Sequence, residues 1–309
     1  MSHRQARHLS YTQRLALCSA WRSTARHTLE RPVELEGIGA HSGLLCRVRL
    51  TPLHEARGLV LNGLPISEWR RDALWATRLT HPLLHDTLST PEHLLAALYM
   101  AGVDDLEITV IGAELPILDG SASPWLSALH PVPTEGGTHP RVWRTLPTLT
   151  VTRHGGSVKT SAERSPAGEE PLTAQLRLSV AELYPELLDS HLDDKVIREL
   201  KRPLIASLMQ AKDLWTSVAV ARTFGLRRHE ASLRANGLIK GVSEDNCLIL
   251  DDHGVTHRPL RHPMELASHK LLDCLGDLAL SGERWRGHLE LHRGSHALNH
   301  ALLSALESH

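Results

Sequence analysis

Cysteine is scarce in this chain of 309 residues, and the few cysteines are scattered. The four of them, Cys18, Cys46, Cys247 and Cys274, include no Cys-x-x-Cys pair. This scarcity argues against a disulfide framework and against a thiolate zinc site. Lone cysteines in a chain of this length usually pack as small buried apolar side chains. We therefore expect a protein of the reducing cytoplasm.

An excess of positive charge and a long apolar run are also absent. The chain has 34 Lys and Arg against 35 Asp and Glu, so it lacks the basic balance typical of nucleic-acid-binding proteins. No apolar run approaches the roughly 20 residues that a membrane span requires. The apolar patch over 15–21 is too short for the core of a secretory signal. We expect a globular monomer with no nucleic-acid partner and no stable membrane insertion.

The length of the chain predicts two domains of roughly 150 residues each. Residues 131–140 are rich in Pro, Gly and Thr, which is typical of a linker. We therefore predict a first domain over 28–130 and a second domain over 141–309. Residues 1–27 contain basic side chains throughout and are interpreted as an N-terminal extension of uncertain order that carries no chemistry.

Strands and helices are predicted in both halves, which indicates the α+β class. Alternating apolar residues near Val33 and again from Leu45 predict two strands joined by a glycine-rich turn. Residues 90–102 predict a helix with Thr90 as N-cap and Pro91 at its first position. Further patterns predict a strand at 106–112, a helix ending near 129, strands near 142–151 and 172–180, a long helical region over 194–215, a helix ending at 237, a strand at 247–252, a helix over 264–282, a strand at 288–294 and a closing helix from 297.

His269, Asp273 and Asp277 are spaced four residues apart within the predicted helix over 264–282. On an α-helix such residues stack on one face. Imidazole and carboxylate groups are good zinc ligands. The chain contains 22 histidines, however, and pairs at this spacing are common as structural contacts. By itself the spacing favours the structural interpretation over a metal site.

A second polar group stands at the start of the helix predicted over 90–102. Taken alone, Glu92 is an ordinary first-turn acid and His93 a partly buried aromatic residue. Combined with His269 and Asp273, His93 completes a set of two histidines and one aspartate, which leaves an open position for water, as in catalytic zinc sites. A neighbouring glutamate that is not a ligand is well placed to take a proton from that water.

His296 lies at a predicted strand-to-helix turn, beside Gly294 and Ser295. A histidine paired with a carboxylate such as Asp277 is kept protonated. In that form it could stabilise an oxyanion or protonate a leaving amine.

Five segments of the chain together resemble one known family. They read STPEHLLAAL, ELPILDGSASPWL, ARTFGL, SHKLLDCLGDLAL and GSHALNHALL, in that order. They are similar to the signature segments of the UDP-3-O-acyl-N-acetylglucosamine deacetylases, and the opening RPVELEGIGAHSG resembles the first strands and turn of that family. The resemblance covers about residues 28–308, and five motifs in the family's order make a chance match negligible.

The resemblance implies two α+β domains, each with a sheet layer and a helix pair, with the helices between the two sheets and the active site at the domain junction. It implies Zn2+ as cofactor, bound by His93, His269 and Asp273. It also implies Glu92 as general base, and His296 as cationic acid oriented by Asp277.

The resemblance further implies a substrate, a UDP-linked acylated glucosamine, and the loss of its acetyl group as the committed step of lipid A synthesis. Thr223 would hydrogen-bond the oxyanion, Phe224 and Leu226 would line the substrate site, and Lys270 would contact the polar part of the substrate. The family builds a groove for the acyl chain from an inserted element, which we expect here within about residues 181–225.

Several positions depart from the family pattern. Leu226 stands where the family usually has an aromatic residue, His229 where it has an acid, and Gly241-Val242-Ser243 where it has Gly-Gly-Ser. The segment before the zinc helix reads RHPMEL instead of an acidic and aromatic run. The proposed catalytic set is nevertheless complete, so we expect an active deacetylase. The alternatives are a non-catalytic, zinc-stabilised protein that binds a sugar nucleotide or acyl chain, and a purely structural interaction protein, which would not need this polar set.

Overall fold

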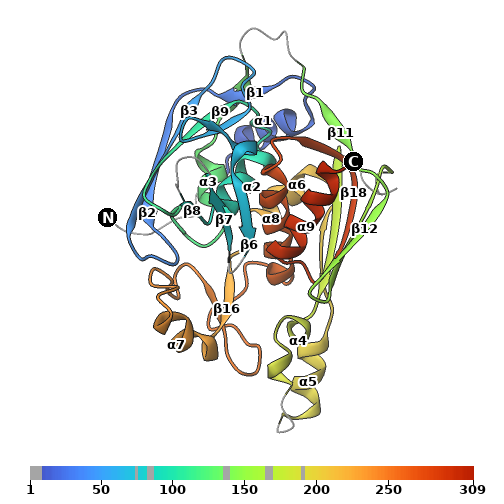
Figure 1. Ribbon diagram of the computed structural model, residues 1–309. Coiled ribbons are helices and arrows are strands. Elements are labelled where there is room, and N and C mark those ends of the chain that lie inside the picture. The colour runs from blue at the N-terminus through green and yellow to red at the C-terminus, as the bar shows by residue number, and fades with distance from the viewer. Residues whose placement is uncertain (1–8, 74–75, 82–86, 135–139, 164–169, 189–191) are drawn as a thin grey trace.

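The computed structural model describes residues 9–73, 76–81, 87–134, 140–163, 170–188 and 192–309. Two β-sheets lie on opposite sides of the molecule, and helices fill the space between them (Figure 1). This arrangement confirms the predicted α+β class with helices between sheets.

The first sheet is built from residues of the N-terminal half. Its strands lie in the order β2 (Val33–Ile38), β3 (Leu45–Pro52), β9 (Leu106–Ile111), β4 (Leu59–Leu61) and β5 (Leu64–Pro65). Val48 and Leu50 of β3 are fully buried while their strand neighbours are exposed, so the alternation in the sequence places one face on the core. A smaller sheet, β6 (Arg70–Ala73), β7 (Thr77–Thr80) and β8 (Thr87–Ser89), brings the chain back toward the helices.

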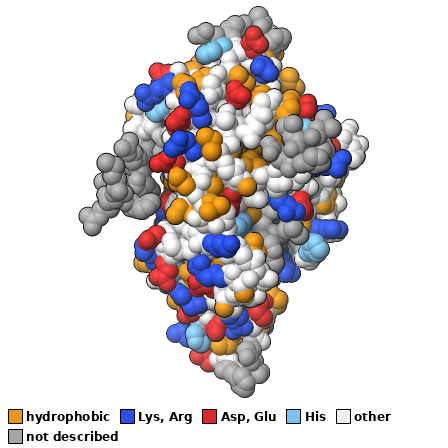
Figure 2. Space-filling view, turned by 60° about the vertical axis from the view of Figure 1, so that its left-hand side comes forward, with side chains coloured by type: hydrophobic (Ala, Val, Ile, Leu, Met, Phe, Trp, Pro, Cys, Tyr) orange, Lys and Arg blue, Asp and Glu red, His pale blue; other side chains and the backbone are white. Residues whose placement is uncertain are grey.

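The outer side of the first sheet is exposed. Figure 2 shows this side of the molecule, where apolar side chains lie among charged side chains of both signs. Across the strands, Arg47 pairs with Glu36 and Arg49 with Glu34. The exposed apolar side chains at this end of the sheet are Ile38, Leu44, Leu45 and Ile111. Charge on this sheet surface is therefore balanced by local pairs.

The second sheet belongs to the C-terminal half. Its strands lie in the order β12 (Leu149–Arg153), β13 (Gly156–Ser161), β18 (Arg284–His292), β14 (Leu172–Leu178) and β15 (Leu204–Leu208), and β11 (Trp143–Thr145) also pairs with β18. Two further pairs are β1 (His27–Leu29) with β10 (Pro131–Pro133), and β16 (Phe224–Leu226) with β17 (Leu248–Leu250). Part of the predicted linker, 131–133, is thus a strand, and 135–139 lie outside the described residues.

The helices of the described residues are α1 (Tyr11–Arg22), α2 (Glu92–Met100), α3 (Ser123–Ala128), α4 (Val180–Leu183), α5 (Asp194–Lys201), α6 (Ala211–Asp213), α7 (Arg227–Ala235), α8 (Glu265–Ala279) and α9 (His296–Glu307). In Figure 1, α2, α8 and α9 form the centre, whereas α7 and the pair α4–α5 project from one end. None of these helices is both long enough and apolar enough to cross a bilayer.

Two local predictions are wrong. Thr90 does not cap α2, because its backbone is left-handed (φ 59°) and its hydroxyl donates to the carbonyl of Ser89. The helix begins at Glu92 after Pro91, with no side-chain cap. The long helix over 194–215 is also wrong. Helix α5 ends before Pro203, which disfavours helical backbone in the residue that precedes it, and the chain continues as strand β15.

The N-terminal extension is ordered where the structure describes it. Helix α1 begins with a capping box at Ser10 and ends against the core through Trp21, which is fully buried. The ring of Trp21 packs edge-on against Tyr99 and Trp143, and its Nε1 donates to Glu170 at 2.9 Å. One indole thus contacts residues from both halves of the chain.

Replacing Trp21 by alanine is expected to lower the free energy of unfolding by about 3–5 kcal/mol, the usual cost of removing a buried tryptophan. Urea denaturation of the two proteins would measure it. Tyr11→Ala is the matched control on the same helix, because Tyr11 is 77% exposed. An equally small effect of both substitutions would contradict the docking of α1 on the core.

Candidate active site

The site begins where helices α2 and α8 cross. A Cβ atom on Gly276 would lie 2.1 Å from the carbonyl oxygen of Glu92, which is closer than any real contact. Only glycine at this point lets the first turn of α2 rest on α8. The crossing brings Glu92 and His93 beside the predicted stack of His269 and Asp273 on α8.

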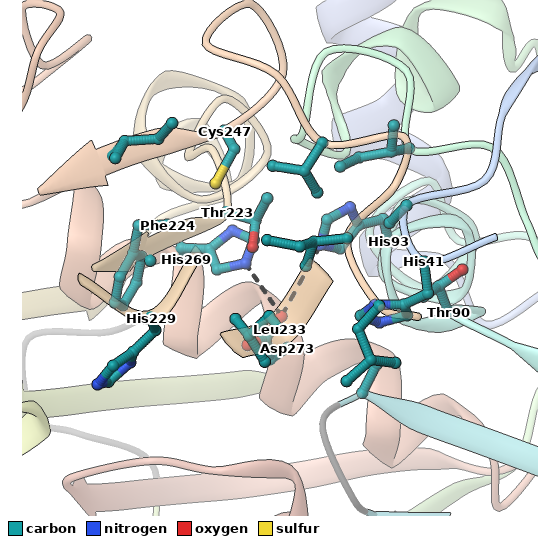
Figure 3. Close-up of a pocket in the computed structure, with 18 of the residues that line it drawn as sticks. His41, Thr90, His93, Thr223, Phe224, His229, Leu233, Cys247, His269 and Asp273 are labelled. Atoms are coloured by element: carbon teal, nitrogen blue, oxygen red, sulfur yellow. Dashed lines mark ion pairs between the residues drawn. The ribbon is translucent and has the colours of Figure 1, made fainter. Parts of the chain in front are cut away.

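Figure 3 shows His93 and His269 pointing toward the carboxylate of Asp273. The distance from His269 Nε2 to Asp273 Oδ1 is 3.4 Å, and that from His93 Nε2 to the same oxygen is 4.0 Å. One ligand atom from each of the three side chains lies within 4.8 Å of the others. Both histidines and the aspartate are thus arranged as a set that could hold one metal ion.

The protonation of this triad favours a cation. His269 Nδ1 lies 3.0 Å from the carbonyl oxygen of Ala221, which can only accept, so the proton is on Nδ1 and a lone pair remains on Nε2. Burial lowers the pKa of His269, and it lowers the pKa of His93 to about 3, so both rings are neutral. Asp273 Oδ1 is buried with no hydrogen-bond partner among the described residues.

Lone pairs on His269 Nε2 and Asp273 Oδ1 therefore face one another without a hydrogen between them. A buried anionic oxygen in this position is costly unless a cation compensates it. Two neutral imidazoles and a carboxylate are the donor set that zinc prefers, and the carbonyl that fixes His269 is a typical outer partner of a metal-bound histidine. The residues present fit a zinc ion.

Glu92 lies in the first turn of α2 and is only 5% exposed. Its Oε2 is buried and has no hydrogen-bond partner among the described residues. Burial, aided by the negative charges of Asp273 and Asp277, raises the pKa of Glu92 to about 8 against the opposing charge of His296. A carboxyl group with a pKa near the working pH and a free oxygen is suited to exchange a proton with a molecule in the site.

His296 begins α9 and lies on the other side of the triad. Its Nδ1 is 2.8 Å from Asp277 Oδ2, and its Nε2 is 3.7 Å from Asp273 Oδ2. Burial opposes the charged form, but Asp277 and Asp273 outweigh it and raise the pKa of His296 to about 9. Asp277 is fully buried; burial disfavours its charged form, yet the neighbouring His296 holds the pKa of Asp277 well below its ordinary value. The arrangement is a cationic imidazole held by a buried carboxylate.

One pocket contains nearly all the residues that the sequence predicts for the site. Its wall includes Glu92, His93, Thr223, Phe224, Leu226, His269, Lys270, Asp273 and His296. Asp277 lies behind His296 and does not line it. Lining residues such as Ala40, His41 and Ile117 come from the first half of the chain, so the pocket lies between the two halves.

Comparison with known proteins adds a separate line of support. A family model described as UDP-3-O-acyl N-acetylglycosamine deacetylase matches residues 26–308. Proteins named UDP-3-O-acyl-N-acetylglucosamine deacetylase from Thermosynechococcus vestitus and Synechocystis are 35% and 33% identical to this chain, over 92% and 88% of it and 94% and 95% of their own lengths. A third with that name, from Oleidesulfovibrio alaskensis, is 31% identical over 91% of this chain and 88% of its own.

The chain belongs to this deacetylase family. Helix α1 precedes the residues that the family model matches, whereas every other helix and strand of the described chain lies within them.

In this deacetylase family member, the apolar side of the pocket extends past the region predicted for it. The expected element, residues 181–225, supplies Tyr184 and Phe224. Most of the apolar side chains come later, from α7, β17 and the segment between them: Leu233, Leu238, Ile239, Val242, Cys247 and Ile249. The predicted boundary is therefore wrong at its C-terminal end. The segment 227–247 carries many charges, and this hid its apolar inner side from sequence reasoning.

His41 is a pocket residue that sequence reasoning missed. Its backbone N–H and that of Ser42 donate to the two oxygens of Glu114, which is buried and fixes the turn. The Nδ1 of His41 is buried and has no partner among the described residues. Glycines around His41 mark a tight turn, but nothing in the sequence indicates that this turn borders the zinc helix.

Two substrate-binding predictions have a definite geometry. Lys270 Nζ is 3.0 Å from Asp273 Oδ2 and 5.5 Å from the ring centre of Phe224. His229, which replaces an acid of the family pattern, lines the pocket and pairs with Glu186 at 2.9 Å. A negative group thus remains beside position 229, contributed by a different segment.

Proposed function

We propose that this chain is a zinc-dependent amide hydrolase that removes the acetyl group of UDP-3-O-acyl-N-acetylglucosamine and releases acetate, the committed step of lipid A synthesis. The observation that carries the proposal is the meeting of a two-histidine, one-aspartate set with Glu92 and His296 in a pocket that has an apolar side. We further propose that it acts in the cytoplasm as a monomer, with domains over 28–130 and 141–309 joined by 131–140.

His93, His269 and Asp273 would hold the zinc ion, which supplies Lewis-acid polarisation of the amide carbonyl and of a water molecule. Glu92 accepts a proton from the water that attacks the carbonyl carbon, because its free oxygen faces the pocket and its pKa is raised into the neutral range.

The developing negative charge and the leaving amine need other groups. The Thr223 hydroxyl and the protonated His296 line the same pocket and are the donors for the oxyanion. His296 then gives its Nε2 proton to the amine nitrogen as the carbon–nitrogen bond breaks, and Asp277 keeps the imidazole in place by accepting from Nδ1.

The remainder of the substrate fits the other sides of the pocket. The acyl chain lies along the apolar side chains from Phe224 to Ile249, and each methylene buried there contributes about 0.8 kcal/mol to binding. Lys270 contacts the polar part of the substrate, and Leu226, buried at 4% exposure, supplies apolar surface where the family usually has an aromatic ring.

A non-catalytic binding protein with the same zinc set is the second candidate. Such a protein would need the apolar side and Lys270, but it would have no use for a raised-pKa Glu92 or for a charged His296 held by Asp277. The presence of both groups in one pocket favours the enzyme.

We expect the purified chain to carry about one zinc ion and to release acetate from UDP-3-O-acyl-N-acetylglucosamine, to lose that activity with a chelator, and to regain it with zinc. UDP-N-acetylglucosamine is the matched substrate, because it has the amide but no acyl chain, and we expect a much lower kcat/KM for it. Bound zinc without acetate release would support the binding protein instead. Equal rates on both substrates would contradict the assignment of the apolar side.

A further inference from the structure

Behind His296, a small hydrogen-bonded cluster surrounds the carboxylate of Asp277. It consists of Thr77 from β7 together with Asn299 and His300 from α9. We propose that His300 and Thr77 are positioning residues that fix the Asp277 carboxylate and, through it, the orientation of His296. The inference rests on the proposed function, because it concerns the acid of that reaction.

Each oxygen of Asp277 has its own partners. Oδ2 accepts from His296 Nδ1 at 2.8 Å and from Asn299 Nδ2 at 2.9 Å. Oδ1 accepts from the Thr77 hydroxyl at 2.5 Å, and His300 Nε2 lies 3.5 Å from the same oxygen. His300 Nε2 is closer to the hydroxyl oxygen of Thr77, at 3.1 Å. Asp277 is thus held from two sides, with His296 on one and the Thr77–His300 pair on the other.

The directions of these hydrogen bonds follow from the donors available. A carboxylate only accepts, so Thr77 gives its single hydroxyl proton to Oδ1. The contact between His300 and Thr77 then requires the proton to come from His300 Nε2. The result is a chain in which His300 donates to Thr77 and Thr77 donates to Asp277. Hydrogen bonds in such a chain polarise and strengthen one another in a buried site.

The orientation of His296 depends on this chain. Because Asp277 accepts from Nδ1, the imidazole presents Nε2 to the pocket, where it lies 3.7 Å from Asp273 Oδ2. If Oδ1 lost its partners, the carboxylate could rotate and the ring of His296 with it. Outer partners of this kind typically change activity by about 10- to 100-fold. His300 itself does not line the pocket, so its contribution is to positioning and not to contact with substrate.

The chain also joins the two halves of the molecule. Thr77 belongs to the first half, whereas Asp277 and His300 belong to the second. The side chain of His300 is 12% exposed and that of Asp277 is fully buried. The pocket therefore requires a polar contact between the halves directly behind its acid.

The test compares His300→Leu, which removes the donor, with His300→Gln, whose amide can donate from nearly the same place. For His300→Leu we expect kcat about 10-fold lower with KM and zinc content unchanged, and for His300→Gln a rate close to that of the unaltered protein. Thr77→Val removes the hydroxyl at constant shape, and its effect on kcat should not add to that of His300→Leu. His288→Gln is the matched control, because His288 contacts Thr173 at 2.8 Å in a similar pair outside the pocket.

Urea denaturation of the same zinc-loaded variants gives a second readout, in which the Thr77 and His300 substitutions should again be non-additive. The inference is wrong if His300→Leu keeps kcat, if His300→Gln is as slow as His300→Leu, or if the effects of Thr77→Val and His300→Leu are additive. Acetate release by the unaltered protein is measured in parallel. Its absence overturns the proposed function, and additive unfolding effects would then still decide against the Thr77–His300 coupling.

Discussion

Glu92→Gln is expected to lower kcat by about 10²- to 10⁴-fold, the range for removing a general base, while the protein keeps its bound zinc. Glutamine has the same shape as glutamate but cannot take a proton. Zinc should be retained because the three groups that come together as a metal site are His93, His269 and Asp273, and Glu92 is not among them. Metal analysis and acetate release, measured on one preparation, would separate binding from turnover.

His93→Ala is the matched control for this experiment, since it changes the adjacent residue of the same helical turn. It removes one of three predicted ligands, so both zinc and activity should be lost. The contrast between the two variants is the informative result. If Glu92→Gln keeps the full rate, Glu92 is not the base. If it loses zinc as His93→Ala does, Glu92 acts as a ligand and the predicted division of roles is wrong.

The histidine and carboxylates of α8 could be predicted because the signal is local. His269, Asp273 and Asp277 lie four residues apart on one helix, and the helix itself has a clear apolar period. What joins this helix to Glu92 and His93 is not local. The contact depends on Gly276, where any side chain would meet the backbone of α2, and a single glycine inside a helix does not show which segment it faces.

The parts that sequence reasoning missed depend on partners far away in the chain. The apolar side of the pocket is formed by a few side chains within the charged segment 227–247, and their inward direction is set by the β16–β17 pair. Similarly, strand β15 follows Pro203, where only its pairing with β14 decides between helix and strand. In both cases tertiary contacts override a weak local pattern.

The N-terminal extension teaches the same lesson. Its basic composition gave no reason to expect packing, yet α1 docks through Leu17 and Trp21, which are 1% and 0% exposed. The Glu170 carboxylate that accepts from Trp21 also accepts from the side chain of Arg22 and the backbone of Ala211. A carboxylate 150 residues away in the chain thus provides the partner that a buried indole N–H requires.

Asp277→Asn should act on the acid as strongly as Glu92→Gln acts on the base, lowering kcat by about 10²- to 10⁴-fold. Asp277 is the largest influence that raises the pKa of His296 to about 9, so its neutralisation lowers that pKa. The reaction needs protonated His296, which is present below its pKa and lost above it. The alkaline limb of the pH profile of kcat should therefore move toward lower pH in the variant.

The shift of that limb distinguishes an electrostatic role for Asp277 from a merely structural one. If Asp277 acts by keeping His296 charged, the deficit of Asp277→Asn is smallest at acid pH, where His296 is protonated without help, and grows as the pH rises. Damage to the pocket alone would give the same deficit at every pH. Zinc content serves as the control, because Asp277 lies outside the predicted ligand set and the variant should bind as much metal as the unaltered protein. An unmoved alkaline limb with full zinc would show that His296 does not supply the proton.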